Sequence, residues 1–479
     1  MIFNSIQFML FILITIVIYF LIPLKYRWGW LLLTSYYFYA CGSLNYLFLM
    51  FFLTIATYLL ALKLENEQQS KYLLIFGVGF NLIFLIFFKY FNFISESATE
   101  LIRFFSIQSD PLLINFILPL GISFYIFQNI SYLIDVYAKK IPAEKHLGLF
   151  AVYVSFFPKL ISGPIERAGD FIPQLKTKNP LNYLNFVFGL KLIILGFFKK
   201  LVIADRLGFL VNTIYSSPTD YCGIPLILAV VFFPLQLYFD FSGYIDIARG
   251  SSKVLGIQLS KNFNRPLFAR NPADFWKRWH ITLSKWFEDY VFTPLYLFTS
   301  KIRFFSKLNF KNKHFLSFFL SLFIGEIFLG LWHGANWTFV LFGVYYAIFI
   351  FLYYLFRKKF DKLPILLKII STICLVIGSF IFFRANSVSD AVYILLNLFN
   401  FESIQGVNFG LRPAEIFLGL FFAILFFFVE FLHEFKFKIL NSKLFNSGIF
   451  KWFLYLALTL LILFFGIFKT STNFIYQQF

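Results

Sequence analysis

Five histidines give this chain side chains that exchange protons near neutral pH, and two of them stand among tryptophans. His333 lies in the sequence Gly330-Leu-Trp-His-Gly-Ala-Asn-Trp337, at the break between two apolar stretches. Neutral imidazole can take the proton of a hydroxyl group while that oxygen attacks an electrophile, so we predict that His333 is a general base. The alternative is a structural histidine that satisfies backbone carbonyls where two helices form a tight hairpin.

His280 lies in a second unusual segment, which runs from Asp274 to Trp286. Trp276, Trp279 and His280 are spaced i, i+3 and i+4, so a helix would place them on one face. Such a face, opposite a basic one, suits a helix that lines a funnel, and it equally suits a plain anchor at the membrane interface. His280 is therefore the second candidate for a site residue, with the plain anchor as the alternative.

Basic residues surround His280 and could bind the phosphates of a substrate: Arg265, Arg270, Lys277, Arg278 and Lys285. Most such clusters only enforce the topology of a membrane protein, so both interpretations stay open. Asn336 follows His333 by three residues, and we predict that its amide hydrogen-bonds the imidazole or a substrate carbonyl.

Other groups of reactive residues are weaker evidence for a catalytic or metal site. Asp240 and Asp246 are six residues apart and would point about 120° apart on a straight helix, so they form no close pair. Glu430 and His433 have the i, i+3 spacing of metal ligands, but no third ligand lies nearby, and we predict no metal site. The three cysteines are far apart, which suggests neither a disulfide framework nor a zinc site.

The composition predicts a membrane protein that carries these residues. Of 479 residues, 60% are hydrophobic and 14% charged, whereas a soluble domain has roughly 45–50% apolar and about 25% charged residues. A membrane helix needs about 20 mainly apolar residues. Segments of this kind occur near 5–22, 28–41, 45–62, 72–93, 112–134, 184–210, 224–246, 315–331, 335–356, 365–383, 414–433 and 451–469.

Two further segments are apolar or aromatic but do not read as simple spans. Prolines and a glycine break the stretch 147–183, which we predict to be re-entrant, and 262–300 is amphipathic and aromatic. Broken backbone at membrane depth is tolerated only where it is buried in protein or lines a cavity. These segments therefore indicate an internal site.

The formal charge of +19 indicates a basic face toward anionic lipid and the cytoplasm, and we expect no nucleic-acid partner. The Lys- and Arg-rich connections alternate with poor ones, which predicts an external N-terminus and a cytoplasmic segment 247–314. We see no internal repeat and no separate soluble domain. The chain 1–479 is therefore predicted to be one membrane domain.

Five sequence blocks match a known family in the right order. They are Leu118-Pro-Leu-Gly-Ile-Ser-Phe-Tyr through Asp135, Phe156-Phe-Pro-Lys-Leu-Ile-Ser-Gly-Pro-Ile-Glu-Arg167, Asp240-Phe-Ser-Gly-Tyr-Ile-Asp-Ile-Ala248, the segment from Asn262 to Tyr290, and Leu331-Trp-His-Gly-Ala-Asn-Trp337. On these blocks the chain resembles the membrane-bound O-acyltransferase superfamily, within it the bacterial alginate O-acetylases and the D-alanyl transfer proteins of teichoic acid. The ending Asn473-Phe-Ile-Tyr-Gln-Gln-Phe479 is similar to the aromatic C-terminus of the alginate branch.

The resemblance implies an all-α polytopic membrane protein, in which a ring of about 11–12 transmembrane helices and re-entrant segments surrounds a central channel. The signature-bearing core would span about 118–345, with the essential histidine of the family at His333 and its second histidine at His280. Donor-binding residues are then expected in the matching blocks: Asn264, Arg265, Trp276, Lys277, Arg278 and Asn336.

The implied activity is O-acyl transfer in a bacterial inner (cytoplasmic) membrane. A cytoplasmic thioester, acetyl-CoA or an acylated carrier protein, would donate an acyl group, most simply acetyl, toward hydroxyls of an envelope polysaccharide or exopolysaccharide. An exported esterase-like protein is the expected partner, and no tightly bound cofactor is expected. The alternatives are a transporter or flippase, a scaffold for an exported acyltransferase, and D-alanyl or other acyl transfer to a cell-wall polymer.

The chain departs from the family pattern on the predicted cytoplasmic side. Asp274 stands where Glu is common before Phe-Trp, Glu288 stands where Arg is common before Asp-Tyr, and 295–300 replaces a glycine-rich loop. These changes bear on the identity of the donor more than on the class of reaction.

Overall fold

In the part of the chain that the computed structural model describes, the regular secondary structure is helical and there is no strand. The described residues are 3, 5–67, 70–115, 117–302, 310–401, 412–437, 442, 447–468 and 474–475. Of the C-terminal sequence noted above, only Phe474 and Ile475 fall within them.

The chain divides into two compact units, each built from separate stretches of sequence. The first unit contains residues 1–193 and 245–260. Its helices are α1 (Ile6–Leu21), η1 (Leu24–Tyr26), α2 (Arg27–Ala40), α3 (Leu44–Asn66), α4 (Lys71–Leu85), η2 (Ile86–Tyr90), α5 (Phe91–Phe104), α6 (Ile122–Tyr137), α7 (Leu147–Ser155), α8 (Phe157–Leu160), α9 (Ala168–Lys176) and most of α10 (Tyr183–Phe197).

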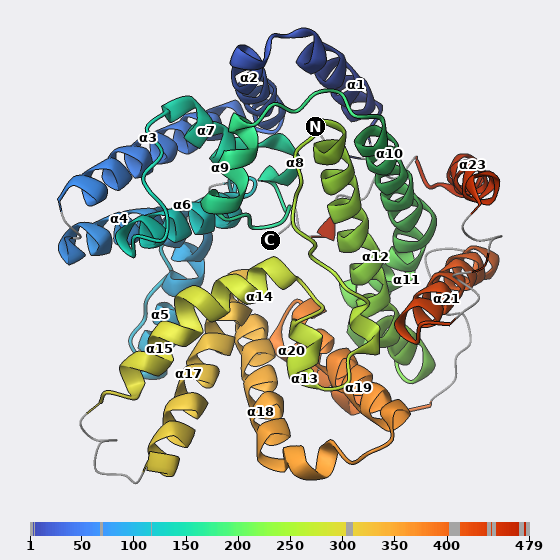
Figure 1. Ribbon diagram of the computed structural model, residues 1–479. Coiled ribbons are helices and arrows are strands. Elements are labelled where there is room, and N and C mark those ends of the chain that lie inside the picture. The colour runs from blue at the N-terminus through green and yellow to red at the C-terminus, as the bar shows by residue number, and fades with distance from the viewer. Residues whose placement is uncertain are drawn as a thin grey trace. The chain divides into compact units, whose positions relative to one another are not determined.

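The second unit contains residues 194–244 and 261–475 (Figure 1). Its helices are η3 (Phe198–Ala204), α11 (Asp205–Ser216), η4 (Pro218–Asp220), most of α12 (Ile224–Val254), η5 (Pro266–Phe268), α13 (Pro272–Trp276), α14 (Ile281–Phe287), η6 (Glu288–Phe292), α15 (Thr293–Thr299), α17 (Phe310–His333), α18 (Trp337–Phe360), α19 (Ile365–Arg384), α20 (Val388–Asn397), α21 (Pro413–Glu434) and α23 (Gly448–Phe465). Both candidate histidines belong to this unit.

Within the described ranges, eight helices are long and apolar enough to cross a membrane, which confirms a multi-pass all-α protein. They are Leu44–Asn66, Lys71–Phe104, Ile224–Val254, Lys313–His333, Trp337–Phe360, Ile365–Arg384, Pro413–Glu434 and Gly448–Phe465. The predicted number was about 11–12, and the difference has two causes. Three of the predicted segments form helices of 14–16 residues, α1, α2 and α6, and 184–210 becomes a charged helix interrupted by the π-helix η3.

The segment predicted to be re-entrant is broken and buried. Residues 147–183 form the short helices α7, α8 and α9, and every residue of α8 is buried. The predicted span 112–134 is helical only from Ile122, and α6 buries all but two of its residues inside the first unit. Irregular backbone that is covered by protein in this way satisfies the constraint on polar groups at membrane depth.

Two glycines set the spacing of the helical pair α17 and α18, which lie side by side in Figure 1. A Cβ atom at Gly330 would lie 2.1 Å from the backbone oxygen of Phe339, and one at Gly343 would lie 2.3 Å from that of Glu326. The absence of side chains at these positions lets the two backbones touch, as in other close helix pairs in membranes. This contact fixes the end of α17, where His333 lies.

We expect the Gly343→Ala variant to destabilise the helix pair, because its methyl group would overlap the backbone of Glu326. Overpacking of this kind costs about 1–3 kcal/mol. Thermal unfolding of the purified protein in detergent should show the loss. Gly325→Ala on α17 is the matched control, since its Cβ would meet no atom within 4 Å. Equal unfolding temperatures for the two variants would contradict the close contact.

Candidate active site

His333 is the last residue of α17 and is buried in aromatic side chains. Its ring centroid lies 5.0 Å from that of Phe383 and 5.8 Å from that of Phe342, and both contacts are edge-to-face. The chain turns directly after it, and α18 begins at Trp337. The imidazole is therefore held at a helix end, inside the protein, with little freedom to turn.

Trp332 connects the two predicted catalytic histidines. Its indole lies 5.0 Å from the His333 ring and 5.8 Å from the His280 ring, measured between ring centroids. Phe241 of α12 contacts the His280 imidazole, with 4.9 Å between the ring centroids. The structure thus brings His280 and His333, 53 residues apart in sequence by their numbering, against one indole ring.

His280 has a left-handed backbone conformation, with φ 44° and ψ 51°. This conformation is uncommon for a residue with a side chain and persists only where the surroundings enforce it. The imidazole is fully buried, and this burial lowers the pKa of His280 to about 3. At neutral pH the ring is therefore uncharged, and it can accept or donate a hydrogen bond.

Asn262 holds the backbone in this conformation. Its backbone oxygen accepts a hydrogen bond from the Ile281 N–H at 2.9 Å. Its side-chain Oδ1 accepts from both the backbone N–H and the hydroxyl group of Thr282, at 3.0 and 2.9 Å. These bonds satisfy the first N–H groups of α14, which begins directly after His280.

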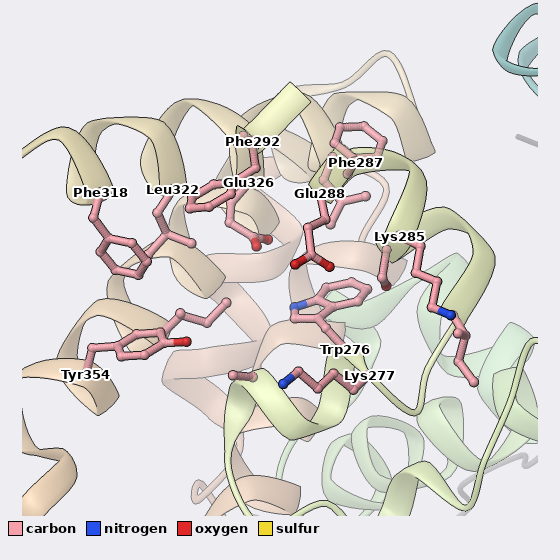
Figure 2. Close-up of a pocket in the computed structure, with 16 residues that line it drawn as sticks. Trp276, Lys277, Lys285, Phe287, Glu288, Phe292, Phe318, Leu322, Glu326 and Tyr354 are labelled. Carbon is pink, nitrogen blue, oxygen red and sulfur yellow. The ribbon is translucent and has the colours of Figure 1, made fainter. Parts of the chain in front are cut away.

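A mainly apolar cavity of about 500 Å³ lies between α13–α15 and the pair α17–α18 (Figure 2). In Figure 2 the carboxyl groups of Glu288 and Glu326 point into it, and Trp276 and Lys277 line the opposite side. Leu329 also lines the cavity and precedes His333 by four residues on α17. Since residues four apart share a helix face, the cavity approaches to within one turn of the catalytic candidate.

A second, polar cavity of about 510 Å³ adjoins the first, because both include Ala273, Lys277 and Tyr354 in their walls. The side chains around it are Arg270, Asn271, Asp274, Lys277, Arg278, Tyr353, Tyr354 and Arg357 together with Ala273. Four of these are cations and one is an anion, so the wall has a positive charge that suits phosphate groups.

The structure separates the predicted donor-binding residues into two sets. Trp276 and Lys277 line the apolar cavity, and Lys277 and Arg278 line the polar one. By contrast, Arg265 and the exposed Asn264 line neither of the two. Arg265 forms an ion pair with Glu434 of α21 at 3.3 Å, and this pairing gives it a role in packing.

Arg278 both forms ion pairs and lines a cavity. It pairs with Glu434 and with Asp274, at 3.1 Å each, while it still lines the polar cavity. These two carboxylates raise the pKa of Arg278 above its ordinary value although burial lowers it. Lys277 has no ion pair among the described residues, and it is exposed at the border of both cavities.

Two predictions about local geometry are wrong. Trp276, Trp279 and His280 do not share a helix face, because α13 ends at Trp276 and the chain turns before α14. The Asn336 amide does not bind the imidazole. It caps α18 instead, accepting from the Thr338 N–H at 3.0 Å and donating to the backbone oxygen of Asn386 at 3.0 Å.

Sequence reasoning missed several residues of this region. Glu326 is a lone carboxyl group within the apolar span 315–331, and the cost of a charge at that depth could have marked it. Phe241 and Trp332 occur in the matched blocks but carry no chemical signal of their own. Over the described ranges, no group of three His, Cys, Asp or Glu side chains could hold a metal ion.

Comparison with known proteins identifies the family. Residues 145–389, which include both histidines, match the MBOAT, membrane-bound O-acyltransferase family. This chain belongs to that family. The match covers α7 to α19 and therefore the residues that line both cavities and Trp332 as well.

The relatives that match much of the chain are named for acetyl transfer to alginate or peptidoglycan, or for D-alanyl transfer to teichoic acid. A probable alginate O-acetylase of Azotobacter vinelandii is 34% identical over 84% of this chain and 78% of its own. The peptidoglycan O-acetyltransferase of Helicobacter pylori is 32% identical over 81% and 76%. The teichoic acid D-alanyltransferase of Bacillus subtilis is 30% identical over 52% and 63%. The MBOAT chain described here is accordingly an O-acyltransferase.

We expect Asn262→Ala to reduce both stability and acyl transfer, because it leaves the buried Thr282 N–H without its acceptor and releases the backbone at His280. An unsatisfied buried donor costs about 1–3 kcal/mol. Unfolding in detergent and the rate of acyl transfer are the two measurements. Asn264→Ala, two residues away and exposed, should leave both unchanged. If both variants behave like the wild type, Asn262 does not position His280.

Proposed function

We propose that this MBOAT protein transfers an acetyl group from a cytoplasmic thioester, acetyl-CoA or an acylated carrier protein, to hydroxyls of an envelope polysaccharide or exopolysaccharide. The observation that carries the proposal is the position of His333, buried one helical turn beyond the wall of a cavity large enough for a thioester arm. The membrane is then the bacterial inner membrane, and an exported esterase-like protein completes the transfer.

The chemistry requires one base and no net uptake of protons. His333 accepts the proton of the acceptor hydroxyl as its oxygen bonds to the thioester carbon, and then gives that proton to the departing thiolate. The products are an ester and a free thiol. His280, uncharged and in contact with the same Trp332 indole, is placed to hydrogen-bond the thioester or its tetrahedral intermediate.

The donor enters through the two adjoining cavities. The phosphates of its carrier group bind at the polar cavity, where Lys277 and Arg278 are positive. The flexible arm then occupies the apolar cavity. The indole N–H of Trp276 is buried there without an acceptor, so a carbonyl of the arm would satisfy it.

One observation favours D-alanyl transfer as a second candidate. Two carboxyl groups, those of Glu288 and Glu326, face the apolar cavity, and a carboxylate there could bind the ammonium group of an aminoacyl thioester. The mass of the transferred group distinguishes alanyl from acetyl esters.

The decisive experiment measures ester-linked acyl groups on the surface polysaccharide by mass spectrometry. Cells carry the wild type, no gene, His333→Gln, or His433→Gln as a control at an exposed histidine, at matched membrane abundance. We expect wild-type ester with the control and its loss with His333→Gln, since removal of a general base lowers the rate roughly 10²–10⁴-fold. Wild-type ester in the His333→Gln cells would refute the assignment.

We expect Lys277→Met to raise the KM for the donor by about tenfold and to leave kcat unchanged. The reason is that a phosphate contact far from the reacting carbon is equally strong in the ground and transition states, and its loss amounts to about 1.4 kcal/mol. Kinetics of the purified protein in lipid nanodiscs test this. Lys358→Met is the control, because Lys358 is exposed and lines neither cavity. A fall in kcat alone would argue against phosphate binding.

A further inference from the structure

A buried charge cluster, whose residues line neither of the two cavities, has no role in the acyl-transfer chemistry proposed above. The Lys200 ammonium pairs with Asp240 at 2.6 Å and with Asp205 at 2.9 Å. All three side chains are at most 2% exposed. Asp240 belongs to the membrane-spanning helix α12, where ionised groups are costly and commonly serve a function.

Phe474 and Ile475, called the C-terminal segment below, enter this cluster. The Ile475 N–H donates to Oδ2 of Asp240 at 2.8 Å, while Oδ1 of the same carboxylate accepts from Lys200. The ring of Phe474 lies over the Lys200 ammonium at 4.5 Å and against Tyr244 at 5.1 Å. Phe474 is 1% exposed, so the segment is seated in the cluster and does not lie on a surface.

A second backbone contact lies earlier in the sequence, directly after α23. The Ile467 N–H, two residues beyond α23, donates to the backbone oxygen of Leu201 at 3.1 Å. Leu201 belongs to the π-helix η3, in which the Asp205 N–H bonds to the oxygen of Lys200, five residues back. Turns of this kind are rare and occur frequently at functional sites.

The contacts are those of a peptide in a binding site. Two main-chain N–H groups are recognised by a carbonyl and a carboxylate, and one aromatic side chain covers the ammonium. The cluster contains two carboxylates and one ammonium, and the Ile475 N–H gives the second carboxylate an additional donor. A buried carboxylate needs such donors.

The same helix connects the cluster with the active site. Asp240 and Tyr244 are four residues apart on α12 and together hold the segment. Phe241, which follows Asp240, contacts the imidazole of His280. A displacement of Asp240 or Tyr244 would therefore move Phe241, which contacts the ring of His280.

We propose that Lys200, Asp205 and Asp240 form a binding site for the C-terminal segment of this chain, and that its occupancy holds Phe241 against His280. The link to catalysis rests on the function proposed above, whereas the binding of the segment does not. Lys200, Asp240 and Phe474 are positioning residues in this scheme. They do not touch the reacting atoms.

Alkylation of a cysteine at position 475 tests the binding site directly. The full-length chain carries Ile475→Cys with its three native cysteines replaced by serine, and N-ethylmaleimide labelling is followed over time. We expect slow labelling in this background and labelling at least tenfold faster when Asp240→Asn is added. Asp246→Asn is the matched control on α12, since Asp246 lies near Arg249 at 3.9 Å. Equal labelling rates for all three proteins would overturn the proposal.

Acyl-transfer kinetics of the same full-length variants test the coupling. Asp240→Asn should lower kcat severalfold with an unchanged KM for the donor, because the donor cavities do not include α12. Phe474→Leu, which preserves every charge, should show the same pattern more weakly. Fast labelling combined with wild-type kcat in both variants would overturn the coupling to His280. If the wild type transfers no acyl group, the proposed function fails, and the labelling comparison still decides whether the site binds the segment.

Discussion

The indole of Trp332 packs against the imidazoles of both His280 and His333, and the geometry of the site depends on this contact. It requires α17 to end at His333, which in turn requires the close approach of α17 and α18 at Gly330 and Gly343. Phe241 packs against the His280 ring and Phe383 against the His333 ring, and both imidazoles are buried. Burial in such surroundings favours the uncharged ring, which is the form that a general base needs.

The second unit holds a polar cavity and an adjoining, mainly apolar one. The acyl transfer proposed above would use the first for the phosphates of the donor and the second for its thioester arm. Cations surround the polar cavity, where a phosphate would pay little for desolvation. The adjoining cavity is mainly apolar and includes Leu329, one helical turn before His333, in its wall. For the thioester donor proposed above, a buried base favours transfer to a hydroxyl over hydrolysis.

Backbone polar groups account for most of the precise positioning. Asn262 uses its carbonyl and its side chain to fix the start of α14, which forces His280 into a left-handed conformation. Asn336 caps α18 and thereby sets the turn after His333. These asparagines fix the backbone next to the two histidines, and each replaces water that the backbone would otherwise bind.

The sequence by itself determined that the protein is a helical membrane protein, because hydropathy and apolar run length are local properties. It also singled out His280 and His333 by their neighbouring tryptophans, and the structure places both rings against Trp332. It could not determine which helices are long enough to span, since α6 is apolar yet has only 16 residues, most of them buried in protein. It also failed at the 276–280 segment, where an ideal helix was expected. Only the tertiary structure decided that break, because Asn262, many residues earlier, supplies its hydrogen bonds. The ion pair of Arg265 with Glu434 also joins residues far apart in the sequence, and so does the contact of the Phe474 ring with the Lys200 ammonium. The partner of a charged side chain cannot be identified from the sequence, because folding brings the two together.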